Sequence, residues 1–168
     1  MFFGPSKRDK QILGTVSDIV VKQFKGILEI QWDTYGVGIN FLMVGGKFFE
    51  TEWLLGYISG WFEGYVRALK LSEKYWKQAI ENALGVTESC IQELYKHEGM
   101  KINWLRIVQK KGKTQNYLEG LEAGLTEGSA SGQHIKSWID DGIFPTDQTV
   151  MFGSLEVKLR QGNNLSVL

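Results

Sequence analysis

The stretch LEGLEAGLTEGSASG, residues 118–132, has a glycine at every fourth position. Four residues are close to one turn of an α-helix, so these glycines would form a bare stripe along one helix face. Each interior glycine costs a helix about 1 kcal/mol relative to alanine. Such a stripe is useful where a side chain would keep another backbone from approaching. The glycines of this stripe are Gly120, Gly124, Gly128 and Gly132.

A second stripe of the same spacing lies in GYISGWFEGYVRA, residues 56–68. A shift of 64 residues superposes Gly56, Gly60, Glu63 and Gly64 on Gly120, Gly124, Glu127 and Gly128. We therefore expect an internal duplication, with helices at about 49–71 and 115–141 that cross face to face with approximate two-fold symmetry. The seven glycines together cost about 7 kcal/mol of helix propensity, which dispersion and Cα–H contacts between the backbones would offset.

One segment of the second helix has an alternative interpretation. GSASG, residues 128–132, has the composition of a flexible loop, and the helix would then end near Glu127. Helical spacing resumes after it, because Ile135, Trp138 and Ile139 fall three and four residues apart.

Capping residues predict the other helices. Ser6 can begin a first helix, whose apolar residues continue at helical spacing to Phe24 before Gly26. Ser72 can begin a short helix that ends before Gly85. In the same way, a helix can run from Thr87 to the residue before Gly99.

Three segments carry strand signals. Residues 27–46 favour two short strands, and 101–109 fits either a strand or the start of a helix. SLEVKL, residues 154–159, alternates strictly, with Leu155, Val157 and Leu159 on one face. A lone strand needs an edge to pair with, in the same chain or on another subunit. We therefore predict a single α+β domain over 1–168, mainly α-helical, in which a small antiparallel sheet includes the C-terminal strand.

An aromatic ridge and two glutamates flank the glycine stripes. The ridge is Trp53, Tyr57, Trp61 and Tyr65, and its interpretations are a core, an apolar pocket or a partner-binding surface. Glu63 and Glu127 hold equivalent positions beside the expected crossing. If both faced one cavity, they would form a carboxylate pair able to share a proton or hold a metal. Glu63 has Arg67 one turn later at ion-pair spacing, whereas Glu127 has no such local partner.

Sequence motifs give no support for catalysis. GKT, residues 112–114, lacks the first glycine of a phosphate-binding loop. GSASG has alanine where a nucleophile elbow has serine, and GVGINF, residues 36–41, lacks the third glycine of a dinucleotide fingerprint. We expect no catalytic residue, no metal and no cofactor.

Charge and cysteine content narrow the class of protein. Nineteen basic residues balance nineteen acidic ones, so no overall field attracts nucleic acid or an anionic membrane. The longest candidate span, 53–66, contains Glu63 and is shorter than the roughly 20 residues that cross a bilayer. A single cysteine excludes an internal disulfide and favours a reducing compartment, the cytoplasm.

LLGYISGWFEGY, residues 54–65, resembles a segment of small bacterial immunity proteins, which neutralise secreted toxins. The resemblance covers about a dozen residues, and the cysteines expected in that family are missing. Glycine-spaced helices are also similar to those of four-vinyl-reductase and trafficking-particle ligand-binding domains, whose cysteine-bearing C-terminal motif is absent. The first resemblance implies a protein inhibitor, and the second implies a ligand-binding fold.

These observations lead to two functional hypotheses. The first is a non-enzymatic protein-interaction module, an adaptor, inhibitor or immunity-type protein, that acts through an aromatic or apolar surface and can form a homodimer. The second is a small-ligand-binding or enzymatic domain, with its pocket between the glycine helices and the Trp/Tyr ridge. In that case Glu63 or Glu127 would be its polar group.

Overall fold

The computed structural model describes residues 4–16, 22–24, 26–27, 52–94, 114–143 and 152–158, and the statements below concern these residues. The elements, in chain order, are α1 (Lys7–Thr15), α4 (Glu52–Ala68), the 3-10 turn η2 (Glu73–Tyr75), α5 (Trp76–Leu94) and α7 (Gln115–Asp140). A short helix at 153–158 follows. None of the described residues is in a strand. The predicted α+β class with an antiparallel sheet is therefore wrong, and the described chain is mainly helical.

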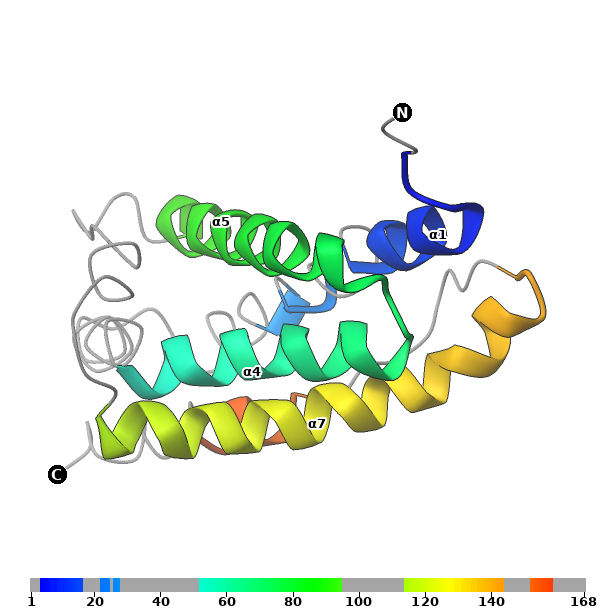
Figure 1. The fold of residues 1–168 in the computed structure, drawn as a ribbon. Coiled ribbons are helices and arrows are strands. Elements are labelled where there is room, and N and C mark those ends of the chain that lie inside the picture. The colour runs from blue at the N-terminus through cyan, green and yellow to red at the C-terminus, as the bar shows by residue number, and fades with distance from the viewer. Residues whose placement is uncertain are drawn as a thin grey trace, which may run out of the picture.

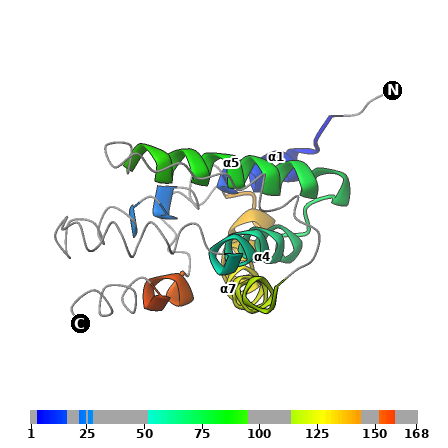
Figure 2. The ribbon, with the colours of Figure 1, turned by 90° about the vertical axis from the view of Figure 1, so that its left-hand side faces the viewer.

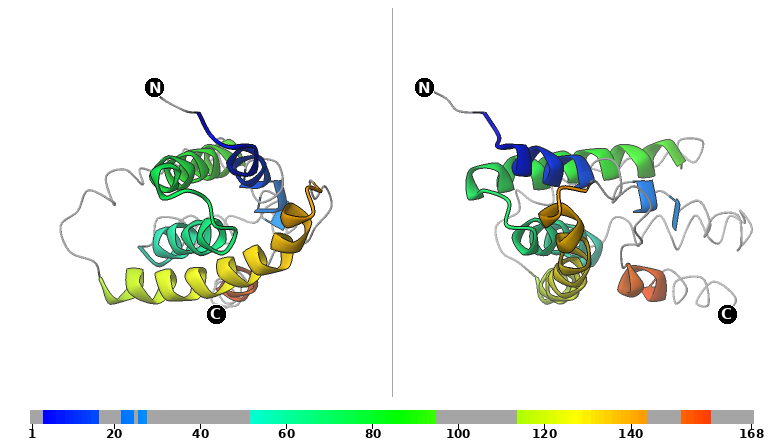
Figure 3. Two further views of the ribbon diagram at one scale, coloured as in Figure 1. Left: turned by 45° about the vertical axis from the view of Figure 1, so that its right-hand side comes forward. Right: turned by 90° about the vertical axis from the view of Figure 1, so that its right-hand side faces the viewer.

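The helices form layers around α4. Figure 1 shows α1 and α5 on one side of α4 and α7 on the other. α4 and α7 run in the same direction. α5, which lies between them in the sequence, runs in the opposite direction. The short helix 153–158 lies beside the α4–α7 pair (Figures 2 and 3). Because it is covered from several sides, α4 is buried nearly all round, as an apolar helix at the centre of a domain should be.

Local sequence signals explain where the helices begin. Ser6 caps α1 as predicted, and Asp9 completes a capping box with it. Thr114 caps α7, because its side chain accepts a 3.2 Å hydrogen bond from the Tyr117 N–H.

The C-terminal ends of α4 and α7 use one motif with different residues. After α7, Gly142 has a φ of 75°, and the Ile143 N–H donates to the Trp138 carbonyl at 2.8 Å. After α4, Lys70 takes the same left-handed conformation with a φ of 59°, and the Leu71 N–H donates to the Val66 carbonyl at 3.0 Å. Both are Schellman ends, in which glycine is the usual residue at the left-handed position.

Hydrogen bonds from α1 fix its position against the connection between α4 and α5. The buried Asp9 carboxylate accepts from the Ser72 N–H at 3.1 Å and from the Ser72 hydroxyl at 3.0 Å. Arg8 donates to the Leu69 carbonyl at 3.1 Å and to Asp140 of α7 at 2.5 Å. The N-terminal half of α1 is therefore anchored to the elements on either side of it.

Three further predictions about helices need correction. α5 is continuous from Trp76 to Leu94, so Gly85 does not end a helix and Thr87 does not begin one. Ser72 precedes the 3-10 turn but makes no side-chain capping bond. The GSASG segment at 128–132 lies inside α7 and is not a loop. Ile27, the first residue of the predicted strand segment 27–46, is helical, whereas 28–46 and the element at 101–109 fall outside the described residues.

The predicted C-terminal strand is a helix. Alternation would place Leu155 and Val157 on one face, but Leu155 is fully buried and Val157 is 53% exposed. In the observed helix, Leu155 lies one turn after Phe152, which is also buried. This pair packs into the core, so tertiary contacts override a short period-two pattern.

Candidate functional site

The two glycine stripes face each other along the contact between α4 and α7. A Cβ placed on Gly56 would overlap the Tyr117 carbonyl oxygen, and one on Gly124 would overlap that of Tyr57. At Gly132 the added Cβ would lie 2.7 Å from the Ala68 Cβ. At each of the seven glycines, a side chain would bring a contact below 3.0 Å, which real Cβ atoms essentially never show. The bare stripes are therefore required for this backbone-to-backbone approach.

The contact repeats itself when the chain is shifted by 64 residues. Gly56 faces the backbone of Tyr117 and Leu121, and Gly120 faces that of Trp53 and Tyr57. The relation also holds for Gly60 with Gly124, and in part for Gly64 with Gly128. Parallel helices with reciprocal contacts have an approximate two-fold axis along their length. The internal duplication itself stays a prediction.

The aromatic ridge of α4 lies in the core. Trp53 and Tyr57 stack with ring centroids 5.0 Å apart, and Trp61 and Tyr65 stack at 5.1 Å. Phe152, which precedes the short helix, stacks on Trp61 at 4.7 Å. All four ridge residues are buried, Trp53 being the most exposed at 5%. The ridge therefore presents no aromatic surface to a partner.

The two equivalent glutamates have different partners. Glu63 pairs with Arg67, with the Oε1 and guanidinium nitrogen atoms 2.6 Å apart. Glu127 accepts hydrogen bonds from the Tyr57 hydroxyl at 2.5 Å, the Ser154 N–H at 2.9 Å and the Ser154 hydroxyl at 2.5 Å. Glu127 thus links α4, α7 and the start of the short helix 153–158.

The residues at equivalent positions explain the difference between the glutamates. Tyr57 corresponds to Leu121, which has no hydroxyl to offer Glu63. Arg67 corresponds to Ser131, which has no charge to offer Glu127. Ser154 could not be recognised as a partner of Glu127 from the sequence, because its segment has a strand pattern.

Tyr57 is a fixed hydrogen-bond donor. Burial, the hydrogen bond to Glu127 and the charge of that carboxylate all raise the pKa of Tyr57 far above its ordinary value. A backbone hydrogen bond from Leu155 lowers this pKa by less. The phenol therefore keeps its proton at physiological pH, and we interpret the Tyr57–Glu127–Ser154 cluster as a structural link.

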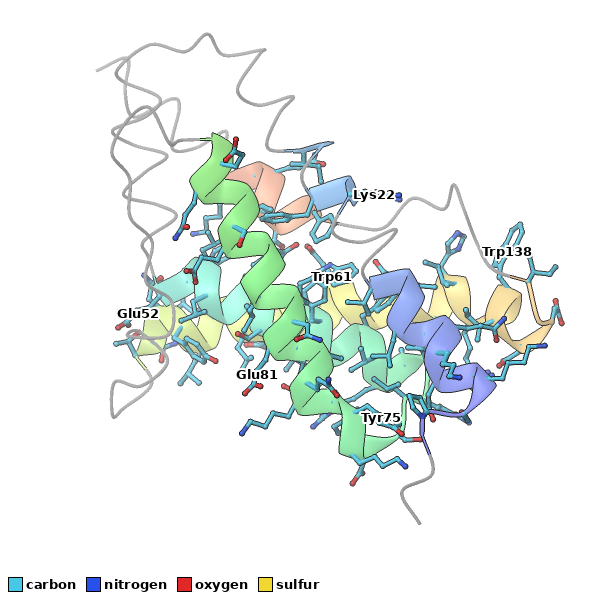
Figure 4. The ribbon with its side chains drawn as sticks, turned by 90° about the horizontal axis from the view of Figure 1, so that it is seen from above. Lys22, Glu52, Trp61, Tyr75, Glu81 and Trp138 are labelled. Atoms are coloured by element: carbon cyan, nitrogen blue, oxygen red, sulfur yellow. The ribbon has the colours of Figure 1, made fainter. Side chains whose placement is uncertain are left out.

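A groove of about 460 Å³ lies between α1 and α5, away from the glycine contact. Ala79, Ala83 and Val16 are buried at its floor, whereas Gln78 and Asn82 are exposed along the α5 rim. Figure 4 looks onto α1 and α5 and shows Tyr75 at the start of α5. The lining residues are Pro5, Leu13, Val16, Tyr75, Gln78, Ala79, Asn82 and Ala83.

A cation marks the Tyr75 end of this groove. The Lys74 ammonium lies 4.8 Å from the Tyr75 ring centroid. Glu81 lies on the side of α5 away from α1 (Figure 4) and is 3.8 Å from Lys77. The nearby Asp9 carboxylate is buried and already accepts hydrogen bonds from Ser6 and Ser72.

An open, acidic hollow of about 330 Å³ lies beside the Glu127 link. Within the described part of the chain, no three His, Cys, Asp or Glu side chains come together as metal ligands. The residues that line the hollow are Glu119, Glu122, Ala123, Thr126, Glu127 and Ser154.

No helix in the described part of the chain is long and apolar enough to cross a membrane.

Comparison of the chain with family models, curated proteins and solved structures gives no match.

Proposed function

We propose that this protein is a non-enzymatic interaction module that binds another protein in the groove between α1 and α5. The observation that carries the proposal is the groove itself. Its floor is apolar and formed by small side chains, and its rim carries the amides of Gln78 and Asn82. An apolar centre with a polar rim is the usual composition of a protein-binding surface.

The groove replaces the surface that the sequence suggested. The Trp/Tyr ridge is packed between helices, so it supports the protein core instead of contacting a partner. The anchoring of α1 through Asp9 and Arg8 holds one wall of the groove in place before a partner arrives. A preformed site loses less conformational entropy on binding.

A photo-crosslinking amino acid at Gln78 tests the proposal in the native host. The matched control is the same substitution at Glu81, which is exposed on the other side of α5. We expect a protein adduct from position 78 and none from position 81. Equal labelling at both positions, or no adduct at position 78, would contradict the proposal.

The second candidate function is the binding of a small apolar ligand. The groove volume of about 460 Å³ favours it, because sites for small molecules commonly range over roughly 300–1,000 Å³. Native mass spectrometry of protein purified from its host distinguishes the two. A bound small molecule that is lost when Ala83 is replaced by leucine would favour this candidate over the first.

Self-association and a cytoplasmic location are further parts of the proposal. An unpaired strand at 154–159 would favour a homodimer, but the described part of that segment is a helix packed on its own chain. Light scattering after gel filtration tests self-association. Fluorescence microscopy of a tagged chain in its host tests the location.

A further inference from the structure

We draw no further inference here: the strongest candidate, the open hollow on α7 beside the Glu127 link, is lined by a cluster of acidic side chains, and no second observation within the described residues points to a ligand for it.

Discussion

The Tyr57 hydroxyl on α4 donates a 2.5 Å hydrogen bond to Glu127 on α7, across 70 residues of sequence. The same carboxylate accepts two hydrogen bonds from Ser154. One acidic side chain thus fastens the short helix 153–158 to the α4–α7 pair, whereas the equivalent Glu63 pairs with Arg67 on its own helix.

Tyr57→Phe should lower the free energy of unfolding by about 1.5–3 kcal/mol, because a hydrogen bond to a charged acceptor is lost in the core. Tyr65→Phe is the matched control. Tyr65 is equally buried, but its hydroxyl makes no hydrogen bond of normal geometry within the described chain. That substitution should change stability by less than about 0.5 kcal/mol or increase it. Urea unfolding measures both, and equal losses would contradict the assignment.

Glu127→Gln should loosen the helix 153–158 more than the α4–α7 contact. The carboxylate accepts from three donors, the Tyr57 hydroxyl and the N–H and hydroxyl of Ser154, and an amide with one oxygen accepts fewer hydrogen bonds. Amide hydrogen exchange should show faster exchange at 153–158. Glu63→Gln, at the equivalent position, removes only a helical ion pair worth about 0.3–0.5 kcal/mol and should leave that segment unchanged. Faster exchange in both variants would mean that Glu127 has no specific role there.

The two kinds of glycine in this chain should respond oppositely to alanine. At Gly124 a Cβ would overlap the Tyr57 carbonyl oxygen, so Gly124→Ala should destabilise the protein by about 2–3 kcal/mol despite better helix propensity. At Gly85, inside α5, nothing lies within 4 Å of an added Cβ. Gly85→Ala should therefore stabilise by about 0.5–1 kcal/mol. Thermal unfolding of both variants checks the signs, and the prediction fails if Gly124→Ala is harmless.

Lys70 adopts a left-handed conformation that glycine adopts more readily. Lys70→Gly should raise the free energy of unfolding by about 1 kcal/mol, and Gly142→Ala, at the equivalent position after α7, should lower it by a similar amount. Chemical denaturation measures both changes. If Lys70→Gly lowers the free energy of unfolding, the lysine side chain stabilises the fold by more than its left-handed backbone conformation destabilises it.

Asp9 should make stability depend on pH. Burial raises the pKa of this carboxyl, but hydrogen bonds from Ser72 and Ser6 outweigh burial and hold the pKa below its usual value. A carboxyl with a lowered pKa in the folded state stabilises the fold above its unfolded pKa, about 3.9, and loses this contribution as the pH falls through the folded pKa.

The variant Asp9→Asn isolates this contribution. Urea midpoints measured from about pH 5 down to pH 2 should fall less steeply with acid for Asp9→Asn than for the natural chain. Parallel slopes for the two proteins would show that the Ser72 contact does not favour the ionised form.

The sequence predicted the central contact because that contact depends on the absence of side chains. Glycines at helical spacing leave a pattern that can be read directly, and both striped helices lie where they were expected. The prediction of a C-terminal strand was wrong because Phe152 and Leu155 are buried against residues distant in the sequence, such as Trp61, on which Phe152 stacks. Six residues cannot define a helix without such contacts.

The binding site was harder to predict for a related reason. Ala79 and Ala83 repeat the four-residue spacing of the glycines, but alanine is an ordinary helix residue and draws no attention. The groove also requires α1, which is placed there by the distant pairing of Asp9 with Ser72. Likewise, the Trp/Tyr ridge had the composition of a binding surface, and only the position of α4 between other helices shows it to be core.

The separation of α4 and α7 along the chain has a consequence for biosynthesis. α4 leaves the ribosome well before α7, which supplies the glycine face that it packs against. During that interval the most apolar of these helices can be covered, among the described residues, by those that precede α7, such as α1 and α5, and not by α7 itself. A pairing between distant segments forms slowly and leaves apolar surface exposed to aggregation. The nascent chain should therefore depend on chaperones until Asp140 has emerged, and translation stalled between the two stripes should yield an aggregation-prone product.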